Sequence, residues 1–213
     1  YIEASHSFFS QLDEVSKAEG VNLSGVRSEY ADVTGRGVVV GIIDTGIDTA
    51  KAAFQTPEGE TRVLYTWDQY DDNSQRRPRF TRNDGSTQVL DFGAEYTSAD
   101  IDSGFYVGTD IDGHGTHVAG IAAGRDALFP GMAPQSSLIS VINDGGDDES
   151  GFEIFDLSGS GPNLDAYSYM ISRRDELGLP MVVNQSQGTL MGPHDGSSLY
   201  EQALQNDIEQ HNF

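Results

Sequence analysis

Residues 37–43 of this chain, Gly-Val-Val-Val-Gly-Ile-Ile, form a short and almost continuously apolar run. Such a run suits a strand that is buried on both faces, as strands are in a parallel sheet covered by helices. Asp44 follows the run directly, and Thr45 and Gly46 come next. A carboxylate at the carboxyl end of a central parallel strand lies where open α/β sheets build their sites. Asp-Thr-Gly is also ordinary turn chemistry, so the pattern indicates a fold class more strongly than a function.

A second segment predicts a helix that begins at a histidine. Asp112-Gly113 favours a turn, and His114 opens a stretch of small residues that ends at Gly124. The positive end of the helix dipole disfavours imidazolium in the first turn. A neutral imidazole can accept a proton, and a nearby carboxylate can hold its tautomer. We therefore expect Asp44 and His114 to lie side by side as an acid–base pair at the carboxyl end of the sheet.

His117 lies one turn after His114, on roughly the same helix face. With Asp110 or Asp112, the two histidines could form the metal site of a hydrolase. However, no Glu follows His114 as it does in the His-Glu-x-x-His zinc pattern. We therefore favour packing for His117 and keep the metal site as the weakest alternative.

The two motifs together resemble the subtilase family of serine proteases. The Asp of Asp-Thr-Gly and the first His of His-Gly-Thr-His are catalytic in that family, so the resemblance implies these roles for Asp44 and His114. Residues 131–141 resemble the family's Gly-Val-Ala-Pro segment and the strand after it. Four landmarks in the family's order, the fourth being the strand described next, make this a specific signal.

Residues 180–188, Pro-Met-Val-Val-Asn-Gln-Ser-Gln-Gly, are the fourth landmark. They resemble the family's strand that ends in Asn-x-Ser-x-Gly and lines the substrate cleft. The resemblance therefore implies that Ser186, Gln187 and Gly188 bind an extended protein or peptide substrate.

Residues 62–69 and 192–198 look like a bacterial branch of the family that includes clostridial germination proteases and Bacteroides homologues. In that branch the stretch between the Asp and the His is long, and we expect an insertion at approximately residues 56–110. A secreted, cell-envelope or spore-associated location fits the branch, but the sequence does not decide the compartment.

The family's nucleophile motif, Gly-Thr-Ser-x-Ala-x-Pro, does not occur in this sequence, and neither does the segment that carries its oxyanion-hole Asn. Both normally follow the Asn-x-Ser-x-Gly strand. We expect this chain to be a truncated or processed part of a longer protein. Ser186, Ser197 and Ser198 are not substitutes, because none lies in a Gly-x-Ser-x-Gly context.

The composition argues against several classes of partner and of structural feature. The net charge of −22 argues against nucleic acid and anionic membranes, which need clustered Lys and Arg. The absence of Cys excludes disulfides and Cys-based metal sites. No apolar run reaches the ~18 residues of a membrane-spanning helix.

The remaining pattern alternates strands and helices. We expect strands at Val38–Ile43, Ser137–Ile142 and Pro180–Asn184, and helices at His114–Ala123, Asn163–Leu177 and after the capping-box pattern Ser198–Glu201. Asp71–Pro78 and Gly145–Gly151 have loop composition. The β–α alternation predicts an α/β fold, a three-layer αβα sandwich with a mostly parallel sheet. The resemblance makes it subtilisin-like and incomplete at the C-terminus, with residues 26–213 as the N-terminal part of the catalytic domain.

Residues 1–25 are expected to be either an N-terminal arm or a propeptide remnant, because Tyr1–Ser7 resembles the end of many subtilase propeptides. The chain's own propeptide is therefore a candidate partner. We predict no cofactor, with calcium as a weaker alternative at Asp110–Gly113 or Asp144–Glu149. Ala53 occupies the position, nine residues after Asp44, where the family often has a calcium-ligand Asp.

Two functions from different classes remain. The first is a serine endopeptidase whose Ser and oxyanion Asn lie outside this chain. The second is a catalytically inactive subtilisin-like protein that acts as a regulatory or binding module. The presence of both Asp44 and His114 favours the enzyme.

Overall fold

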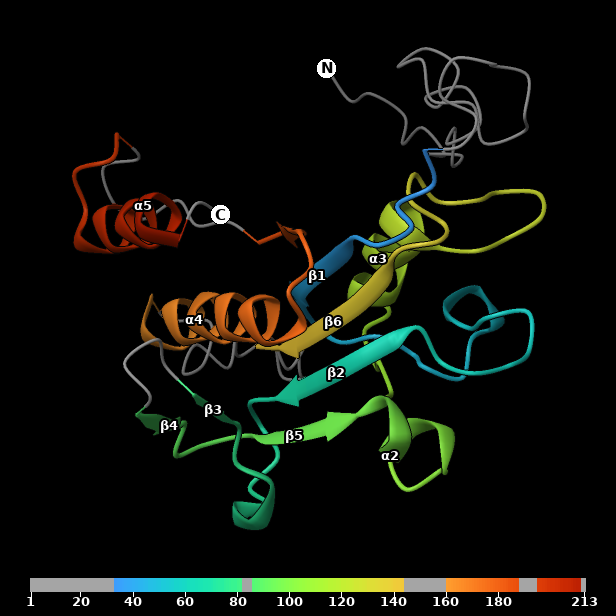
Figure 1. The fold of residues 1–213 in the computed structure, drawn as a ribbon, viewed down its shortest axis with the longest axis horizontal. Coiled ribbons are helices and arrows are strands. Elements are labelled where there is room, and N and C mark those ends of the chain that lie inside the picture. Colours follow the sequence, from blue (N-terminus) through green and yellow to red (C-terminus); the bar gives the residue numbers. More distant parts are fainter. Residues whose placement is uncertain (1–32, 82–85, 144–159, 188–194, 212–213) are drawn as a thin grey trace, which may run out of the picture.

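The computed structural model describes residues 33–81, 86–143, 160–187 and 195–211. In this part of the chain, a five-stranded sheet has the order β5-β2-β6-β1-β7 (Figure 1). The pairs β2–β6, β6–β1 and β1–β7 are parallel, and only β5 is antiparallel to its neighbour. The predicted α/β fold with a mostly parallel central sheet is confirmed. The strands are β1 (Val39–Asp44), β2 (Val63–Asp68), β5 (Ala94–Thr97), β6 (Ser137–Ile142) and β7 (Met181–Gln185).

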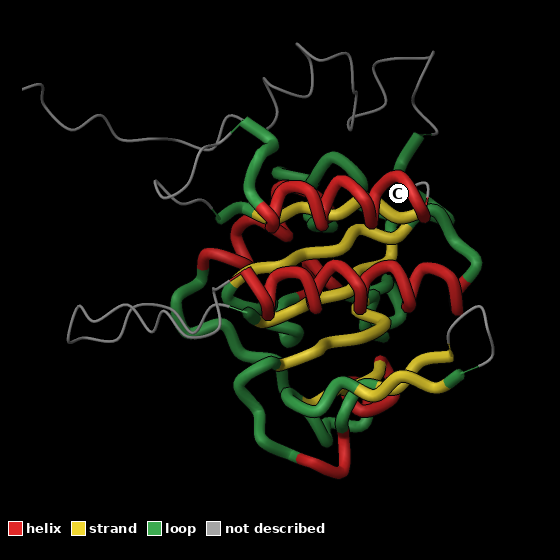
Figure 2. Tube along the Cα trace, turned by 90° about the vertical axis from the view of Figure 1, so that its left-hand side faces the viewer, coloured by secondary structure: helices red, strands yellow, loops and turns green. Residues whose placement is uncertain are grey.

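Helices cover both faces of the sheet. α4 (Ser160–Leu177) packs on one face and α3 (His114–Ala123) packs on the other. β1 alternates between them, since Val39 and Ile43 belong to the α4 side, and Val40 and Ile42 belong to the α3 side. By the same alternation, Asp44 at the end of β1 faces α3. α5 (Leu199–His211) packs against α4, and the two helices are seen together in Figure 2.

The predicted elements are present, with shifts at their ends. The strand at Ser137–Ile142 and the helix at His114–Ala123 have the predicted bounds. β1 and β7 each begin and end one residue later than predicted, and α4 begins at Ser160 rather than Asn163. At the start of α5, Ser198 Oγ accepts from the Glu201 N–H (3.1 Å), and Glu201 Oε2 accepts from the Ser198 N–H (3.0 Å). The predicted capping box is therefore formed.

The segment predicted as an insertion, residues 56–110, contributes to the central sheet as well as to its periphery. β2 lies inside the sheet, between β5 and β6. Within the predicted loop Asp71–Pro78, the regular structure is one short turn of helix, η2. The domain bounds stay predictions. The peripheral elements are η1 (Ala52–Phe54), η2 (Ser74–Arg76), the antiparallel pair β3 (Arg79–Thr81) and β4 (Thr87–Val89), and α2 (Ser98–Asp102).

Two buried arginines tie distant segments together. Arg173 of α4 donates to Glu95 Oε2 of β5 (2.8 Å) and to the Arg79 carbonyl (3.0 Å). The Arg62 guanidinium donates to the carbonyls of Ala53 (2.7 Å), Ala123 (2.6 Å) and Ser136 (2.7 Å). Arg62, which directly precedes β2, therefore joins the last turn of α3 to the residue before β6.

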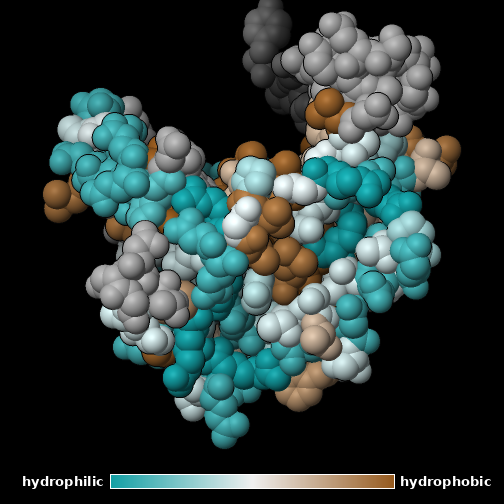
Figure 3. Space-filling model, viewed as in Figure 1, coloured by the Kyte–Doolittle hydropathy of each residue, from teal (hydrophilic) through white to brown (hydrophobic). Residues whose placement is uncertain are grey.

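Several predictions concern residues outside the described ranges. These are Tyr1–Ser7 with the proposed arm, Asp144–Glu149, Gly145–Gly151 and Gly188. Among the helices that the structure describes, none combines the length and apolarity needed to cross a bilayer. Figure 3 shows polar residues over much of the face in view, as the net charge of −22 leads one to expect.

Candidate active site

Asp44 supplies the buried carboxylate of the site. It is the last residue of β1, and only 1% of its surface is exposed. Its Oδ1 accepts a hydrogen bond from the backbone N–H of Thr45 (2.8 Å). Oδ2 is buried and has no hydrogen-bond partner among the described residues. The carboxylate is thus held by the turn that follows the strand, and all of its described partners bind one oxygen.

His114 is the first residue of α3, and glycines on both sides of it allow this position. Gly113 caps the helix in the left-handed conformation (φ 86°), which glycine adopts at low cost. A Cβ on Gly115 would lie 2.3 Å from the Gly46 carbonyl oxygen and 3.1 Å from Asp44 Oδ1. Only a residue without a side chain lets the first turn of α3 approach the Asp44-Thr45-Gly46 turn this closely.

The side chains of Asp44 and His114 meet. His114 Nδ1 lies 2.7 Å from Asp44 Oδ1, so the predicted proximity of the two residues is confirmed. Because Nδ1 donates its hydrogen to the carboxylate, the neutral ring has its lone pair on Nε2. The imidazole side chain is 47% exposed. The arrangement can therefore receive a proton at Nε2 from a group outside the described residues.

The pKa of His114 is raised above its ordinary value of 6.5, chiefly by the hydrogen bond to Asp44. Burial is the second-largest influence and lowers the pKa, while the charges of Asp44, Asp112 and Asp110 raise it. The pKa is therefore raised even though His114 lies in the first turn of α3, where the helix dipole disfavours imidazolium. The cation that forms when His114 accepts a proton is thereby stabilised.

The predicted packing of His117 is wrong, because His117 is exposed. It shares the outer face of α3 with His114, whereas Gly115, Ala119 and Ala123 form the buried face. Within the described ranges, no three His, Asp or Glu side chains converge as a metal site would require. The ligand set proposed for a metallohydrolase is therefore not assembled here. Calcium at Asp110–Gly113 or Asp144–Glu149 stays a hypothesis.

The predicted substrate segment follows β7, which pairs in the described part of the chain with β1 alone. Ser186 is exposed, and its Oγ accepts from Asn184 Nδ2 (2.8 Å). Gln187 instead turns inward, where its Nε2 donates to Asn143 Oδ1 (3.1 Å). Substrate binding by Ser186, Gln187 and Gly188 stays a prediction.

Sequence reasoning missed a cluster of amide side chains beside this segment. Asn143 Nδ2 donates to Asn163 Oδ1 (2.6 Å), and Gln185 Nε2 donates to the same oxygen (2.5 Å). Asn143 comes directly after β6, as Asp44 ends β1, so the rule that sites gather at the carboxyl ends of strands could have found it.

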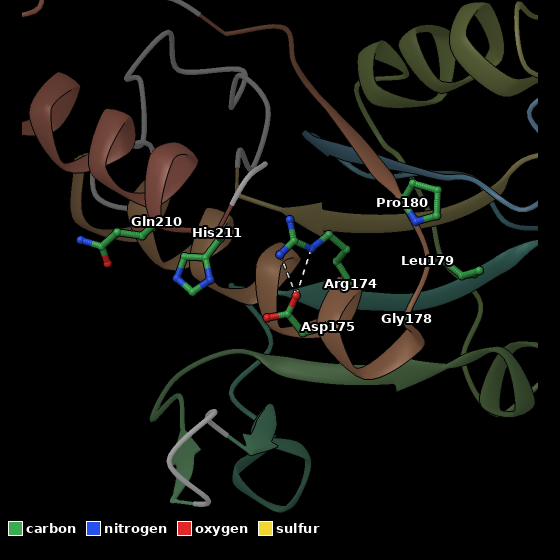
Figure 4. A pocket seen from close by; sticks show the side chains of 7 residues that line it. All are labelled: Arg174, Asp175, Gly178, Leu179, Pro180, Gln210 and His211. Carbon is green, nitrogen blue, oxygen red and sulfur yellow. Dashed lines mark hydrogen bonds and ion pairs between the residues drawn. The ribbon is translucent and has the colours of Figure 1, made fainter.

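An open cavity of about 610 Å³ lies elsewhere (Figure 4). Its lining includes Pro180, which precedes β7, and Met181 pairs with Val39 at the start of β1. The cavity is therefore at the amino end of the sheet, opposite Asp44. Its one cationic side chain from α4, Arg174, is bonded to Asp175 Oδ1 (2.7 Å). None of the predicted site residues lines it.

Comparisons with known proteins identify the family of this chain. The sequence model of the subtilase family matches residues 35–212. The chain belongs to the subtilase family. This subtilase is 30% identical, over 191 residues, to the subtilisin-like protease PopC of Myxococcus xanthus, and the match covers 88% of this chain and 32% of PopC.

Among solved structures, the CspB protease of Clostridium perfringens is similar, with a TM-score of 0.65 and 28% identity. The similarity covers 86% of this chain and 34% of CspB. The subtilase chain therefore spans about a third of the length of each of these relatives.

Proposed function

We propose that the whole protein is a serine endopeptidase in which Asp44 and His114 are the acid and base of an Asp-His-Ser triad. The observation that carries the proposal is the 2.7 Å contact between His114 Nδ1 and Asp44 Oδ1, which leaves Nε2 on a half-exposed ring. A triad needs this orientation, because the base must take the serine proton at the nitrogen that does not face the Asp.

The nucleophile and the oxyanion-hole donor come, in this proposal, from a part of the protein outside these 213 residues. The sequence contains no Gly-Thr-Ser-x-Ala-x-Pro motif, and the relatives are about three times as long as this chain. The serine hydroxyl would give its proton to His114 Nε2 as its oxygen attacks the scissile carbonyl. Asp44 would stabilise the imidazolium, which then protonates the leaving amine.

We further propose that a substrate strand lies along Ser186, Gln187 and Gly188. This segment follows β7, which in the described part of the chain has β1 on one side and no strand on the other. Unpaired backbone groups at a sheet edge are suited to binding an extended peptide. Asp44 ends the neighbouring strand β1, so a peptide bound there would run close to the acid–base pair.

The test is covalent labelling of the full-length protein by a serine-directed fluorophosphonate, together with hydrolysis of denatured casein. We expect stoichiometric labelling at one serine and hydrolysis in the full-length protein, with neither in the 213-residue chain alone. A folded full-length protein that is inert to both reagents would overturn the enzyme in favour of the inactive regulatory module. Labelling of a serine within the 213 residues would overturn the location of the nucleophile.

A further inference from the structure

The Asp110 carboxylate joins the turn after β1 to the first turn of α3. Its Oδ1 accepts from the Thr45 hydroxyl (2.8 Å) and from the Gly113 N–H (2.9 Å). Its Oδ2 accepts from the Thr116 N–H (2.7 Å). Ordinary capping of a helix N-terminus accounts for the two backbone contacts. It does not account for the contact with Thr45, which lies 65 residues away in the sequence.

Thr45 completes the connection from the other side. Its N–H donates to Asp44 Oδ1 (2.8 Å), the same oxygen that binds His114. Its hydroxyl oxygen accepts from the Gly115 N–H (2.9 Å) while the hydroxyl donates to Asp110. Thr45 therefore contacts both the catalytic carboxylate and the residue that follows the histidine.

A further hydrogen bond reinforces the same joint, because the Thr116 hydroxyl accepts from the Asp48 N–H (2.9 Å). The contact between Asp44 and His114 thus depends on two backbones that are held together by short side chains. These side chains allow little relative movement of the two backbones, because Thr and Asp have few rotatable bonds.

We propose that Asp110 and Thr45 are positioning residues, which set the distance and orientation of the His114 imidazole relative to Asp44 without touching substrate. This inference rests on the proposed function only for its effect on turnover. Its structural part holds whether or not the whole protein is an enzyme.

Four variants of the full-length protein test the proposal. Thr45→Val removes the hydroxyl without changing shape or charge, and Thr45→Ser restores the hydroxyl. Asp110→Asn replaces one of the two carboxylate oxygens by an NH₂ group. This group then faces the N–H or O–H donors that the oxygen had bound. Asp112→Asn is the control for charge. Asp112 also raises the pKa of His114, does not contact Thr45 in the described hydrogen bonds, and accepts from the His114 backbone N–H (3.1 Å), a bond that the Asn Oδ1 can keep.

Two measurements are made. The first is kcat and KM on a peptide ester, with active sites counted by the fluorophosphonate. The second is the pKa of the His114 ring, followed by NMR of ¹³C-histidine-labelled protein and assigned with His114→Ala. The charged groups of the described residues that act on this ring are Asp44, Asp110 and Asp112.

We expect Thr45→Val and Asp110→Asn to lower kcat by up to about 100-fold with KM nearly unchanged, as a displaced catalytic group does. Both should also lower the ring pKa, since a looser contact with Asp44 stabilises imidazolium less. Thr45→Ser should resemble the wild type, and Asp112→Asn should lower the ring pKa while keeping kcat per active site.

A Thr45→Val protein with wild-type kcat and wild-type ring pKa would overturn the positioning role. If Asp110→Asn does not fold, Thr45→Val and Thr45→Ser still decide the question. If the wild type is inert, the proposed function fails, and the ring pKa of Thr45→Val alone decides whether the bridge positions His114.

Discussion

Two regions of this chain use charged side chains to join segments that are far apart in the sequence. At the carboxyl end of β1, short Asp and Thr side chains bind backbone N–H groups and leave the His114 side chain 47% exposed. Between β5 and α4, the long Arg173 side chain is only 5% exposed and bonds to Glu95, which is 15% exposed. The first region leaves an imidazole ring half exposed, whereas the second largely buries the charges of Arg173 and Glu95.

The difference in exposure separates side chains that stabilise the fold from side chains that are available for chemistry. Burying a charge is costly unless it is paired and hydrogen-bonded, and Arg173 meets that condition with Glu95, Glu176 and the Arg79 carbonyl. Its removal should therefore cost stability. The Asp44–His114 pair contributes little to stability because the histidine is half exposed, and its removal should cost turnover.

The largest expected effect is on turnover at the first region. Asp44→Asn in the full-length protein should lower kcat/KM by about 10⁴-fold, because an amide does not hold the correct tautomer of His114. His114→Ala should lose at least as much. These magnitudes come from triad substitutions in other serine proteases, including subtilisin of this family. Kinetics on a peptide ester and thermal melts are the measurements. A large loss of Tm in either variant would contradict the contrast between the two regions.

The next effect is on stability at the second region. Glu95→Ala should lower the free energy of unfolding by about 3 kcal/mol, because it leaves Arg173 buried without its main partner. The Tyr169 hydroxyl would also lose its acceptor, Glu95 Oε2 (2.6 Å). Urea unfolding measures this, with Glu176→Ala as the control, since Glu176 is 36% exposed and its loss should cost below about 1 kcal/mol. Equal losses of unfolding free energy in Glu95→Ala and Glu176→Ala would show that the burial of the carboxylate does not determine the loss.

A smaller effect is expected at the ion pair between Arg76 and Asp100. The Arg76 guanidinium lowers the pKa of Asp100 from 3.8 to about 2. The ionised pair therefore stabilises the fold above about pH 4, and this contribution is lost as the pH falls toward 2. Arg76→Gln should cost on the order of 1 kcal/mol at pH 7, because both side chains are partly exposed. In urea unfolding, the gap to the wild type should narrow below pH 4, and a gap that stays constant down to pH 2.5 would refute the assignment.

The pH dependence of turnover sharpens the description of the first region. Since His114 acts as a base only when neutral and its pKa is raised, kcat/KM should fall with decreasing pH through a value above 6.5. The free energy of unfolding depends on pH in the opposite direction. Any stabilisation of the fold by the Asp44–His114 pair is present below pH 6.5 and is lost as the pH rises through the raised pKa of His114. Asp112→Asn should move the acidic limb of the kcat/KM profile down by a few tenths of a pH unit, as a solvated charge does. An acidic limb at or below 6.5 in the wild type would contradict the raised pKa.

The smallest effect is expected at His117. Because its side chain is exposed on the outer face of α3, His117→Ala should change the free energy of unfolding by less than about 0.5 kcal/mol. Turnover should stay close to that of the wild type. Urea unfolding and kinetics on the same peptide ester check both statements, and a loss comparable to that of His114→Ala would show that the two histidines act together.

The elements that the sequence predicts well are those with a continuous apolar run or a clear helix boundary. β1 and β6 are rich in Val, Leu and Ile, and α3 begins after Asp112-Gly113 and ends before Gly124. Asp44 and His114 were found for the same reason, since each occupies the end of such an element.

The rest depended on contacts that no local pattern encodes. β2 has the sequence Val-Leu-Tyr-Thr-Trp-Asp, and its Trp67 is buried against the rings of Phe92 and Tyr169, which lie far along the chain. The hydrogen bond from Thr45 to Asp110 joins residues 65 positions apart, and neither residue type signals the other. The error at His117 arose because helical spacing gives the relative orientation of two residues but not which face is buried.

Arg62 adds a consequence for the motion of α3. Helix ends ordinarily fray, and local opening of a helix tends to begin there. Here the first turn is tied down by Asp110 and Thr45, and the last turn by the guanidinium of Arg62 on the Ala123 carbonyl. Because both ends are held by hydrogen bonds, opening of α3 from its ends should be less frequent than in a helix with free ends. We therefore expect Arg62, although it binds the last turn of α3, to help keep His114 at the first turn in place.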